Sequence, residues 1–568
     1  MILDKTIAAR LRLVLLACGM FMGAGAAAQD QVPADKAAVL FGARESVQDI
    51  SLSPSGNKIA FISAGPGNSE VLNLIDFGRA AQIVKLFAQT DVFTDLDWCR
   101  WADEGHIVCQ ATAMGKTPAG VLVPLDRLFV INLAKSAIRD LSRRPSANAY
   151  GFAQRGGDLL ALDVGGEQGQ VLLSTQLLEE FSAGTRLANT EAGLGAELVD
   201  IANGKRRQIE RADAGALSYV ADETGQLRLK VRTSRDSAGN MTGNFEYLYR
   251  PLDGGVWRSF GKLTIDGKPV ESFAAAAADA SRSSAYGYVK WEGYDALASF
   301  PLDGTGTGKI LLSRPDVDVD TLIRIGRQRR VVGASYATEK RQIAYFDPEL
   351  AKLAKDLGKA LPDQPLINIV GASADENQLL LVAASDTQPG MVYLYDKTKR
   401  ALEPVLPVRG ELQGVKMGQM RPVTYPARDG TQIPAYLTLP PGSDGKNLPA
   451  IVMPHGGPSA RDEWGFDWLV QYFVAKGYAV LQPNYRGSSG YGENWYGKNG
   501  FQAWETAIGD VNDAGRWLVS EGIGRADRLA IVGWSYGGYA ALQSQVLEPA
   551  LFKAVAAIAP VTDLGYVA

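Results

Sequence analysis

Two patterns in the sequence predict a β-propeller followed by a parallel α/β domain. Over the first two thirds of the 568 residues, units of short strands and tight turns recur at intervals of about 46 to 68 residues. Over the last third, apolar strand-like runs alternate with amphipathic helical runs, as in a doubly wound parallel sheet. The pattern changes near Met417, so the predicted domains are residues 46–415 for the propeller and 416–568 for the α/β part.

The repeat of the first domain is recognised from its turns. Each turn leads into an alternating or apolar strand, such as 227–231 or 379–382. Several short strands per unit at a fairly even spacing indicate a β-propeller, and seven units indicate seven blades. A pair of β-sandwiches or a β-solenoid is the alternative, but sandwiches would not keep this spacing over about 370 residues. The turn centres lie near Gly56, Glu104, Gly156, Thr224, Arg282, Gln328 and Glu376.

The composition limits the classes of ligand. A hydrophobic content of 46% and a charged content of 21% are typical of a soluble globular protein. The net charge is −4, so there is no basic excess and nucleic acid is not a favoured partner. We expect no cofactor. The 62 glycines indicate many tight turns, which suits a chain of short strands.

The N-terminus is predicted to be a secretory signal peptide, residues 1–28. Basic residues precede an apolar run over 13–27, and Ala28 ends an A-x-A cleavage site. A membrane anchor is the alternative, but the run is shorter than the roughly 20 residues that span a bilayer. A lipoprotein site at Cys18 would leave too short an apolar segment. We therefore expect a periplasmic or secreted protein with no stable membrane span, in which residues 29–45 form a short lead-in.

Two cysteines remain after this cleavage, Cys99 and Cys109. They flank a turn around Asp103-Glu104, so in a hairpin they face each other across the strands. The oxidising compartment of an exported protein permits a disulfide there. Free buried thiols are the alternative, because the cross-strand geometry must also be suitable. No metal site is expected, because two cysteines and His106 do not complete a tetrahedral zinc site.

The chemistry of the chain centres on Gly533-Trp534-Ser535-Tyr536-Gly537. This G-x-S-x-G motif follows an apolar strand-like run, 529–532, and precedes a helix-like run, 540–547, which is the context of a nucleophile elbow. The two glycines leave room for a sharp turn that exposes the serine hydroxyl. The motif predicts Ser535 as the nucleophile of an α/β-hydrolase, with an ordinary Gly-rich turn as the alternative.

A second glycine-rich segment supplies candidates for an oxyanion hole. Pro454-His455-Gly456-Gly457-Pro458 follows the third strand-like run of the α/β part. In α/β-hydrolases the loop after this strand gives one backbone N–H to the oxyanion, and the residue after the nucleophile gives the other. The predicted donors are therefore the backbone N–H groups of Gly457 and Tyr536.

These two motifs, with Asn484-Tyr485-Arg486-Gly487-Ser488-Ser489-Gly490-Tyr491-Gly492 between them, resemble the prolyl oligopeptidase family of serine peptidases. The acylaminoacyl-peptidase and dipeptidyl-peptidase-like branch is the most similar. The resemblance implies an N-terminal propeller joined to a C-terminal α/β-hydrolase domain. It also implies Ser535 as nucleophile, Gly457 and Tyr536 as oxyanion donors, and short peptides as substrates.

The acid and the histidine base of a catalytic triad are absent from the sequence. It contains two histidines, of which His106 lies in the repeat region and His455 precedes the serine. The order in α/β-hydrolases is serine, acid, histidine. Asp563 is interpreted as a loop or capping residue. We therefore expect a C-terminally truncated hydrolase domain, and little or no peptidase activity of the chain as given.

Two other functions stay open at this point. One is an esterase-like hydrolase, because the elbow does not choose between amides and esters. The other is a non-catalytic propeller binding protein with a relic hydrolase domain. Within the peptidase interpretation, a dipeptidyl peptidase needs propeller acids to hold the free amine of its substrate. Glu179 and Glu180 are candidates, although exposed pairs of glutamates are common.

Overall fold

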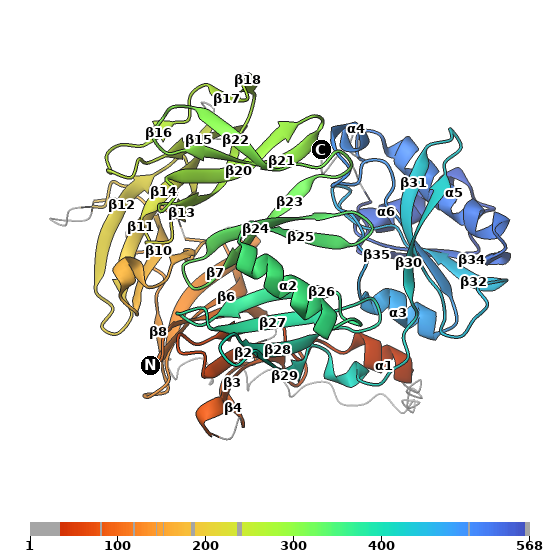
Figure 1. Cartoon of the computed structure of the whole chain (residues 1–568), viewed down its shortest axis with the longest axis horizontal. Coiled ribbons are helices and arrows are strands. Elements are labelled where there is room, and N and C mark those ends of the chain that lie inside the picture. The colour runs from red at the N-terminus through yellow and green to blue at the C-terminus, as the bar shows by residue number, and fades with distance from the viewer. Residues whose placement is uncertain are drawn as a thin grey trace, which may run out of the picture.

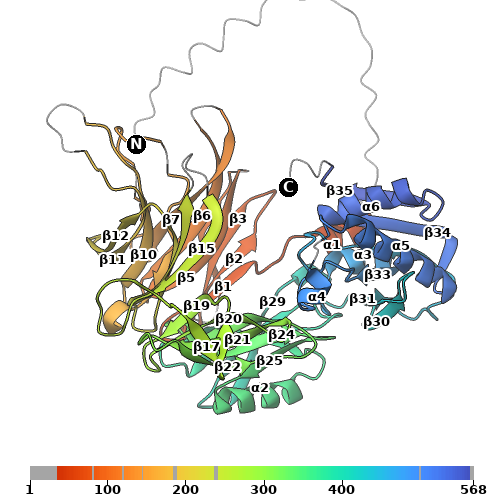
Figure 2. The same cartoon turned by 90° about the horizontal axis from the view of Figure 1, so that it is seen from above.

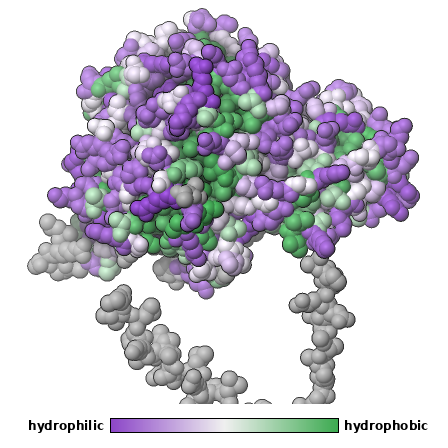
Figure 3. All heavy atoms as spheres, turned by 60° about the horizontal axis from the view of Figure 1, so that its bottom comes forward, coloured by the Kyte–Doolittle hydropathy of each residue, from purple (hydrophilic) through white to green (hydrophobic). Residues whose placement is uncertain are grey.

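The computed structural model describes residues 35–562, except 80–81, 92, 118–119, 144, 152, 183–187, 236–240 and 498–499. The predicted signal peptide and Asp563 lie outside the described residues. The chain forms a ring of β-sheets beside a smaller α/β lobe (Figure 1), and Figure 2 shows the two lobes side by side from above. Polar residues cover most of the face drawn in Figure 3, and an apolar band crosses its larger lobe.

The ring is a seven-bladed propeller in the part of the chain that the structure describes, as the sequence predicts. Each blade is an antiparallel sheet of consecutive strands. The strands, blade by blade, are β1 (Asp49–Leu52), β2 (Lys58–Ala64), β3 (Glu70–Asp76), β4 (Ile83–Gln89); β5 (Thr94–Asp103), β6 (His106–Lys116), β7 (Leu122–Asn132), β8 (Ala137–Asp140); β9 (Leu159–Ala161), β10 (Gln170–Leu177), β11 (Gly193–Asp200), β12 (Arg206–Asp213); β13 (Ala216–Ala221), β14 (Leu227–Arg235), β15 (Met241–Tyr249), β16 (Arg258–Ser259); β17 (Leu263–Ile265), β18 (Lys268–Val270), β19 (Ala274–Asp279), β20 (Ser284–Trp291), β21 (Tyr294–Pro301), β22 (Thr307–Leu312); β23 (Val319–Ile325), β24 (Arg330–Ala337), β25 (Arg341–Tyr345); and β26 (Leu366–Ala372), β27 (Gln378–Ala384), β28 (Met391–Asp396), β29 (Ala401–Pro407).

The innermost strands of neighbouring blades pack together and close the ring. Strand β1 contacts β5 of the second blade and β26 of the seventh, so the first and last blades meet without exchanging a strand. Two blades depart from four strands. The fifth gains β17 and β18, because β17 pairs in parallel with β22. The sixth has β23–β25 only, followed by helix α2 (Pro348–Ala360).

One local prediction differs in the structure. The sequence predicts the third turn near Gly156, but that residue lies before β9, and the loop between β9 and β10 contains the short 3-10 helix η2 (Val164–Gly166). Gly156 is required at its position because a Cβ there would lie 2.6 Å from the Asp126 carbonyl oxygen. Helix α2 interrupts the repeat of strands between the sixth and seventh blades. Its N-terminus is capped by Asp347, and its buried leucines pack against the sixth and seventh blades.

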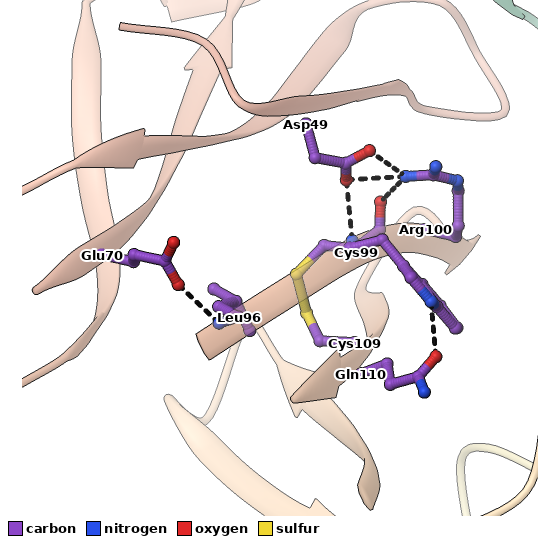
Figure 4. The surroundings of a disulfide bond; sticks show 8 residues. Asp49, Glu70, Leu96, Cys99, Arg100, Cys109 and Gln110 are labelled. Carbon is purple, nitrogen blue, oxygen red and sulfur yellow. Dashed lines mark hydrogen bonds and ion pairs between the residues drawn. A yellow bond between two sulfur atoms is a disulfide. The ribbon is translucent and has the colours of Figure 1, made fainter. Parts of the chain in front are cut away.

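Cys99 and Cys109 form a disulfide between β5 and β6 (Figure 4). They are directly opposite each other in the register of the two strands, and both are buried in the core of the first two blades. Asp49 of β1 accepts hydrogen bonds from the Cys99 backbone N–H at 2.9 Å and from the Arg100 guanidinium at 2.7 Å. The first blade is therefore tied to the strand that carries the disulfide.

Replacing both cysteines, Cys99→Ala with Cys109→Ala, should lower the free energy of unfolding by about 2–3 kcal/mol. The bridge closes a loop with a sequence separation of 10, so removing it restores only a modest amount of entropy to the unfolded chain. Urea unfolding with and without reductant measures the difference. Reductant should destabilise the unaltered chain and leave the double variant unchanged; equal midpoints for all four samples would contradict the prediction.

The α/β lobe is built on a six-stranded sheet with the order β30-β31-β33-β32-β34-β35. Its first two strands form an antiparallel hairpin, and β31 also pairs antiparallel with β33. The other four strands are parallel to one another, as in the predicted doubly wound parallel sheet. The lobe has two hydrophobic clusters. Helix α5 contributes buried side chains to one cluster, and helix α3 contributes to the other. The elements are β30 (Met420–Pro426), β31 (Gln432–Thr438), β32 (Leu448–Val452), α3 (Trp468–Ala475), β33 (Ala479–Pro483), α4 (Glu493–Tyr496), α5 (Trp504–Ser520), β34 (Gly524–Trp534), α6 (Tyr536–Leu547) and β35 (Ala554–Ile558).

Helix α1 (Lys36–Gly42) occupies the lead-in that precedes the propeller and packs on the α/β lobe. Phe41 lies edge-on to Tyr472 of α3, and Asp35 forms an ion pair with Lys476 at 2.7 Å. The chain thus contacts the second lobe before it enters the first. The 3-10 helices η1 (Phe77–Arg79) and η3 (Gly410–Leu412) complete the elements. No described helix is long and apolar enough to cross a membrane.

Candidate active site

Ser535 lies at the sharp turn between β34 and α6. Its backbone has φ 55° and ψ −119°, a conformation that residues other than glycine seldom adopt. Three backbone hydrogen bonds hold it. The Ser535 N–H donates to the Ile558 carbonyl oxygen at 3.0 Å, and the Ser535 carbonyl oxygen accepts the N–H groups of Tyr539 at 3.0 Å and Val561 at 3.3 Å. Such strain persists only where the surroundings impose it, which is typical of functional positions. The side chain is half-buried, at the edge of the lobe.

The glycines of the motif are required by contacts with backbone. A Cβ on Gly533 would lie 1.9 Å from the Gly537 carbonyl oxygen, and one on Gly537 would lie 2.2 Å from that of Pro454. A Cβ on Gly538 would lie 3.0 Å from the Pro560 Cβ and 3.1 Å from its Cα. The turn is therefore pressed between the start of α6 and the loop after β32. This close packing is what forces Ser535 into its strained conformation.

The loop after β32 borders the serine. A Cβ built on Gly456 would lie 3.4 Å from the Ser535 Cβ and 4.0 Å from the Tyr536 backbone nitrogen. Gly457 has φ 117°, which only glycine adopts readily, and precedes a cis Pro458. Tyr536 is the first residue of α6, so its N–H has no partner within the helix. The fold thus brings together the loop of Gly457, the Tyr536 N–H and Ser535.

His455 packs beneath this loop as a structural residue. Its ring stacks on Tyr485 with centroids 4.4 Å apart. Nδ1 lies 2.7 Å from the Gly456 carbonyl oxygen and Nε2 lies 2.8 Å from Ser488 Oγ. Burial lowers the pKa of His455 to about 4, so the ring is neutral at pH 7. Nδ1 is occupied by Gly456 of this loop and Nε2 by Ser488 of the 484–492 segment, so neither nitrogen is available as a base for Ser535.

The other histidine lies in the second blade. His106 Nδ1 is 2.9 Å from the Asp103 carboxylate, and its Nε2 is 2.8 Å from Asn132 Nδ2. It is a hairpin residue, in the position that the sequence predicts. Since the sequence contains only these two histidines and the structure describes both, no histidine of this chain serves Ser535 as a base.

The segment from Asn484 to Gly492 links the site to helix α5 and to the β30–β31 turn. Arg486 donates to both oxygens of the buried Asp510 of α5, at 2.9 and 2.7 Å, and pairs with Asp429 in the β30–β31 turn. The Tyr536 hydroxyl donates to the Gly500 carbonyl oxygen at 2.7 Å. The tyrosine side chain therefore points into the lobe, which leaves only its backbone N–H beside the serine.

A family model described as the prolyl oligopeptidase family matches residues 464–567, which include Ser535 and Tyr536. Residues 464–567 are a prolyl oligopeptidase family domain.

Two curated proteins named as dipeptidyl peptidases are similar to this chain. The chain is 27% identical over 375 residues to dipeptidyl aminopeptidase BIII of Pseudoxanthomonas mexicana, which covers 62% of this chain and 51% of that protein. It is 30% identical over 283 residues to dipeptidyl peptidase family member 6 of Caenorhabditis elegans, covering 44% and 38% of the two chains. The chain thus spans about half, or less, of the length of these relatives.

Solved structures share the whole architecture. A puromycin-hydrolyzing peptidase of Mycobacterium tuberculosis superposes with a TM-score of 0.62 at 18% identity, over 94% of this chain and 80% of that one. A prolyl endopeptidase gives the same TM-score at 15% identity, over 93% and 74%. At this level of identity the likeness shows the fold: a propeller joined to an α/β-hydrolase domain, as the sequence predicts.

The two candidate glutamates of the propeller, Glu179 and Glu180, make different contacts. Glu179 is exposed, and its backbone carbonyl accepts the Tyr150 N–H at 2.8 Å. Glu180 accepts the Asn189 N–H on Oε2 at 3.2 Å and pairs in an isolated bridge with Ala149. Among the described residues no group of histidine, cysteine and carboxylate side chains is arranged to hold a metal ion.

A buried acid next to the prolyl oligopeptidase motifs escaped the sequence analysis. Asp462 accepts the Gln482 amide on Oδ1 at 3.1 Å, while its buried Oδ2 has no hydrogen-bond partner. Its backbone exchanges hydrogen bonds with Asn484 of the second motif, at 2.7 and 3.0 Å. Burial, with a smaller contribution from Asp467, raises the pKa of Asp462 to about 8.

Asp462→Asn should stabilise the chain increasingly as the pH rises from about 4 to 8. The unfolded carboxyl ionises near pH 3.8, whereas the folded one holds its proton up to about 8. Its favourable contribution is therefore complete below pH 4 and is lost as the pH rises through the folded pKa. The variant escapes this loss, by at least about 1.4 kcal/mol at pH 8, the equivalent of one pKa unit.

Thermal unfolding at pH 3.5 and pH 8.5 checks this prediction. The midpoint of Asp462→Asn should lie close to that of the unaltered chain at pH 3.5 and exceed it at pH 8.5. Asp444→Asn, at an exposed loop position, shows whether the loss of one negative charge alone has the same effect. A variant whose stability differs from that of the unaltered chain by the same amount at both pH values would show that the folded Asp462 carboxyl does not hold its proton up to about pH 8.

Proposed function

We propose that the protein is an exported serine-type peptidase that hydrolyses short peptides through an acyl-enzyme on Ser535. The strained Ser535 against the glycine loop, inside a prolyl oligopeptidase family domain, is the observation that carries the proposal. Export follows from the signal peptide predicted over residues 1–28. Sequencing of the mature N-terminus from the exported fraction should begin at Gln29.

In the proposed reaction the Ser535 hydroxyl attacks the scissile carbonyl carbon. The serine proton passes to a base and then to the leaving amine, and the carbonyl oxygen takes the negative charge. The backbone N–H groups of Gly457 and Tyr536 stabilise that charge. Water then attacks the acyl-enzyme carbonyl and releases the acid with the free serine. The propeller beside the lobe would restrict access to small peptides.

The 568 residues supply the nucleophile and the oxyanion donors, but no acid or histidine in the triad order. We therefore expect the isolated chain to hydrolyse peptides about four to six orders of magnitude more slowly than a complete enzyme of this kind. The relative named above that aligns over 375 residues offers a way to test this. A fusion that carries the C-terminal segment of that protein after Thr562 asks whether a related chain supplies the missing base and acid.

The experiment compares the chain, this fusion and the fusion with Ser535→Ala on aminoacyl p-nitroanilides and on simple acyl esters. Peptide hydrolysis by the fusion, lost in its Ser535→Ala form, supports the proposal. Rapid Ser535-dependent hydrolysis by the 568-residue chain itself would overturn the expected need for a histidine. Ester hydrolysis alone would favour the esterase function instead.

A further inference from the structure

A cavity of about 810 Å³ runs along the axis of the propeller. Inner strands of all seven blades line it, including Ser51, Trp101, Leu160, Tyr219, Ala277 and Ile369. Its volume falls within the roughly 300–1,000 Å³ of small-ligand sites. The inner strand β23 shows which end of the cavity faces the α/β lobe. Asp318, just before β23, contacts Gly490 and Gly492 of that lobe, so the strand begins at the end of the cavity near the lobe and runs away from it.

Arg327 bridges the cavity at the end away from the α/β lobe. It lies in the turn after β23, yet its guanidinium binds the Asp163 carboxylate of the third blade at 2.5 and 2.7 Å. It also donates to the carbonyl oxygens of Trp101 and Ala102 in the second blade, at 2.9 and 3.0 Å. These blades are three places away around the ring, so the side chain spans its axis. The cavity is therefore bridged at one end, and its other end faces the α/β lobe.

Two cations near this end have no carboxylate partner among the described residues. Arg324 of β23 donates to the Ala276 carbonyl oxygen at 2.6 Å and has no ion pair. Arg329, in the turn, lines the same cavity, and no side-chain hydrogen bond or ion pair joins it to another described residue. Burial lowers the pKa of the half-buried Arg324 to about 10, and the positive charge of Arg329 lowers it further. Arg329 itself is exposed in the turn, so the repulsion acts between one half-buried and one exposed guanidinium.

The acids that line the cavity are engaged elsewhere. Asp222 pairs with Arg228 at 2.6 Å, and Asp320 pairs with Arg341, which also binds Glu463 of the α/β lobe. Glu223 accepts the backbone N–H groups of the next blade's turn, at 2.9 and 2.8 Å. Arg100 is already neutralised by Asp49 (Figure 4). Among the described charged residues that line the cavity, Arg324 and Arg329 are thus the ones whose positive charge no neighbouring carboxylate balances.

We propose that Arg324 and Arg329 bind a carboxylate of a peptide that enters the propeller cavity from the α/β lobe. A guanidinium presents paired donors that match the two oxygens of a carboxylate, and the partial burial of Arg324 strengthens the interaction. The bound carboxylate would relieve the repulsion between the two arginines. That the ligand is a peptide rests on the proposed function; the carboxylate preference follows from the cavity itself. The carboxylate is either the C-terminus of the peptide or an acidic side chain.

Calorimetric titration of the 568-residue chain with Ser535→Ala tests the site without any hydrolysis. The probes are acetylated tetra-alanine with a free C-terminal carboxylate, the same peptide as its amide, and acetyl-Ala-Ala-Glu-Ala-amide. We expect one of the two carboxylate peptides to bind about tenfold or more tightly than the neutral amide. The free-acid peptide identifies a C-terminal carboxylate as the ligand, and the glutamate peptide identifies a side chain.

Arg324→Gln with Arg329→Gln should abolish this preference. Arg258→Gln, which removes one exposed cation from the outer strand β16, should leave it unchanged. Because the two cavity arginines repel each other, the double variant should unfold at the same or a higher temperature than the parent chain. Equal binding of all three peptides, or a preference that survives the double substitution, would overturn the proposal. Neither result bears on peptidase activity, which the fusion tests separately.

Discussion

Gly533→Ala is expected to lower the free energy of unfolding of the α/β lobe by more than about 4 kcal/mol. The new Cβ would lie 1.9 Å from the Gly537 carbonyl oxygen and 2.8 Å from the Gly538 nitrogen. Both are backbone atoms in the first turn of α6, so no side chain can rotate to make room. The helix would have to move away from β34, which would separate Ser535 from the loop that carries Gly457.

Gly509→Ala provides the matched control within the same lobe. Gly509 lies inside α5, and a Cβ there would have no heavy atom within 4 Å. Alanine should therefore stabilise the chain by about 0.5–1 kcal/mol, the difference in helix propensity. Urea unfolding followed by tryptophan fluorescence measures both variants. If Gly533→Ala cost less than about 1 kcal/mol, the close packing of the elbow would not be what holds Ser535 in its strained conformation.

The elbow was predictable because its requirements are local. The strand, the serine, the glycines and the helix follow one another within a short stretch, so sequence order alone carries the motif. The propeller was predictable for a related reason: each blade is made of consecutive strands, so a repeat of turns maps directly onto a repeat of sheets. The domain boundaries and the roles of Gly457 and Tyr536 remain predictions, although the structure places Tyr536 and the loop that carries Gly457 beside Ser535.

Other features depend on contacts between distant parts of the chain. Asp163 and Arg327 are 164 positions apart, and no local pattern marks them as partners. The loop at Gly156 was mistaken for the inner hairpin of its blade because a Gly-rich segment precedes a strand there as well. Helix α2 begins at an Asp347 cap followed by a proline, but a single helix between strands does not follow from a repeat of turns. In the sequence Asp462 resembles an ordinary acidic loop residue, because its contacts with Gln482 and Asn484 come from a segment about 20 positions away.

Arg327→Met is expected to lower the free energy of unfolding of the propeller by about 3–5 kcal/mol. The substitution leaves the Asp163 carboxylate buried without its partner, because Asp163 is 7% exposed and Arg327 is 8% exposed. It also removes the donors to the Trp101 and Ala102 carbonyl oxygens on the far side of the ring. The sixth blade would then lose its direct link to the second and third blades.

The double variant Arg327→Met with Asp163→Asn separates the stranded charge from the loss of the bridge. Asparagine tolerates the positive φ of 51° at this position and carries no charge, so the double variant should be clearly more stable than Arg327→Met alone. Arg314→Met, which breaks an exposed ion pair with Asp316, should cost no more than about 1 kcal/mol. Urea denaturation of the three variants gives the values. If Arg327→Met cost no more than Arg314→Met, the cross-ring bridge would contribute nothing to the stability of the propeller, and the far end of its cavity would be open in solution.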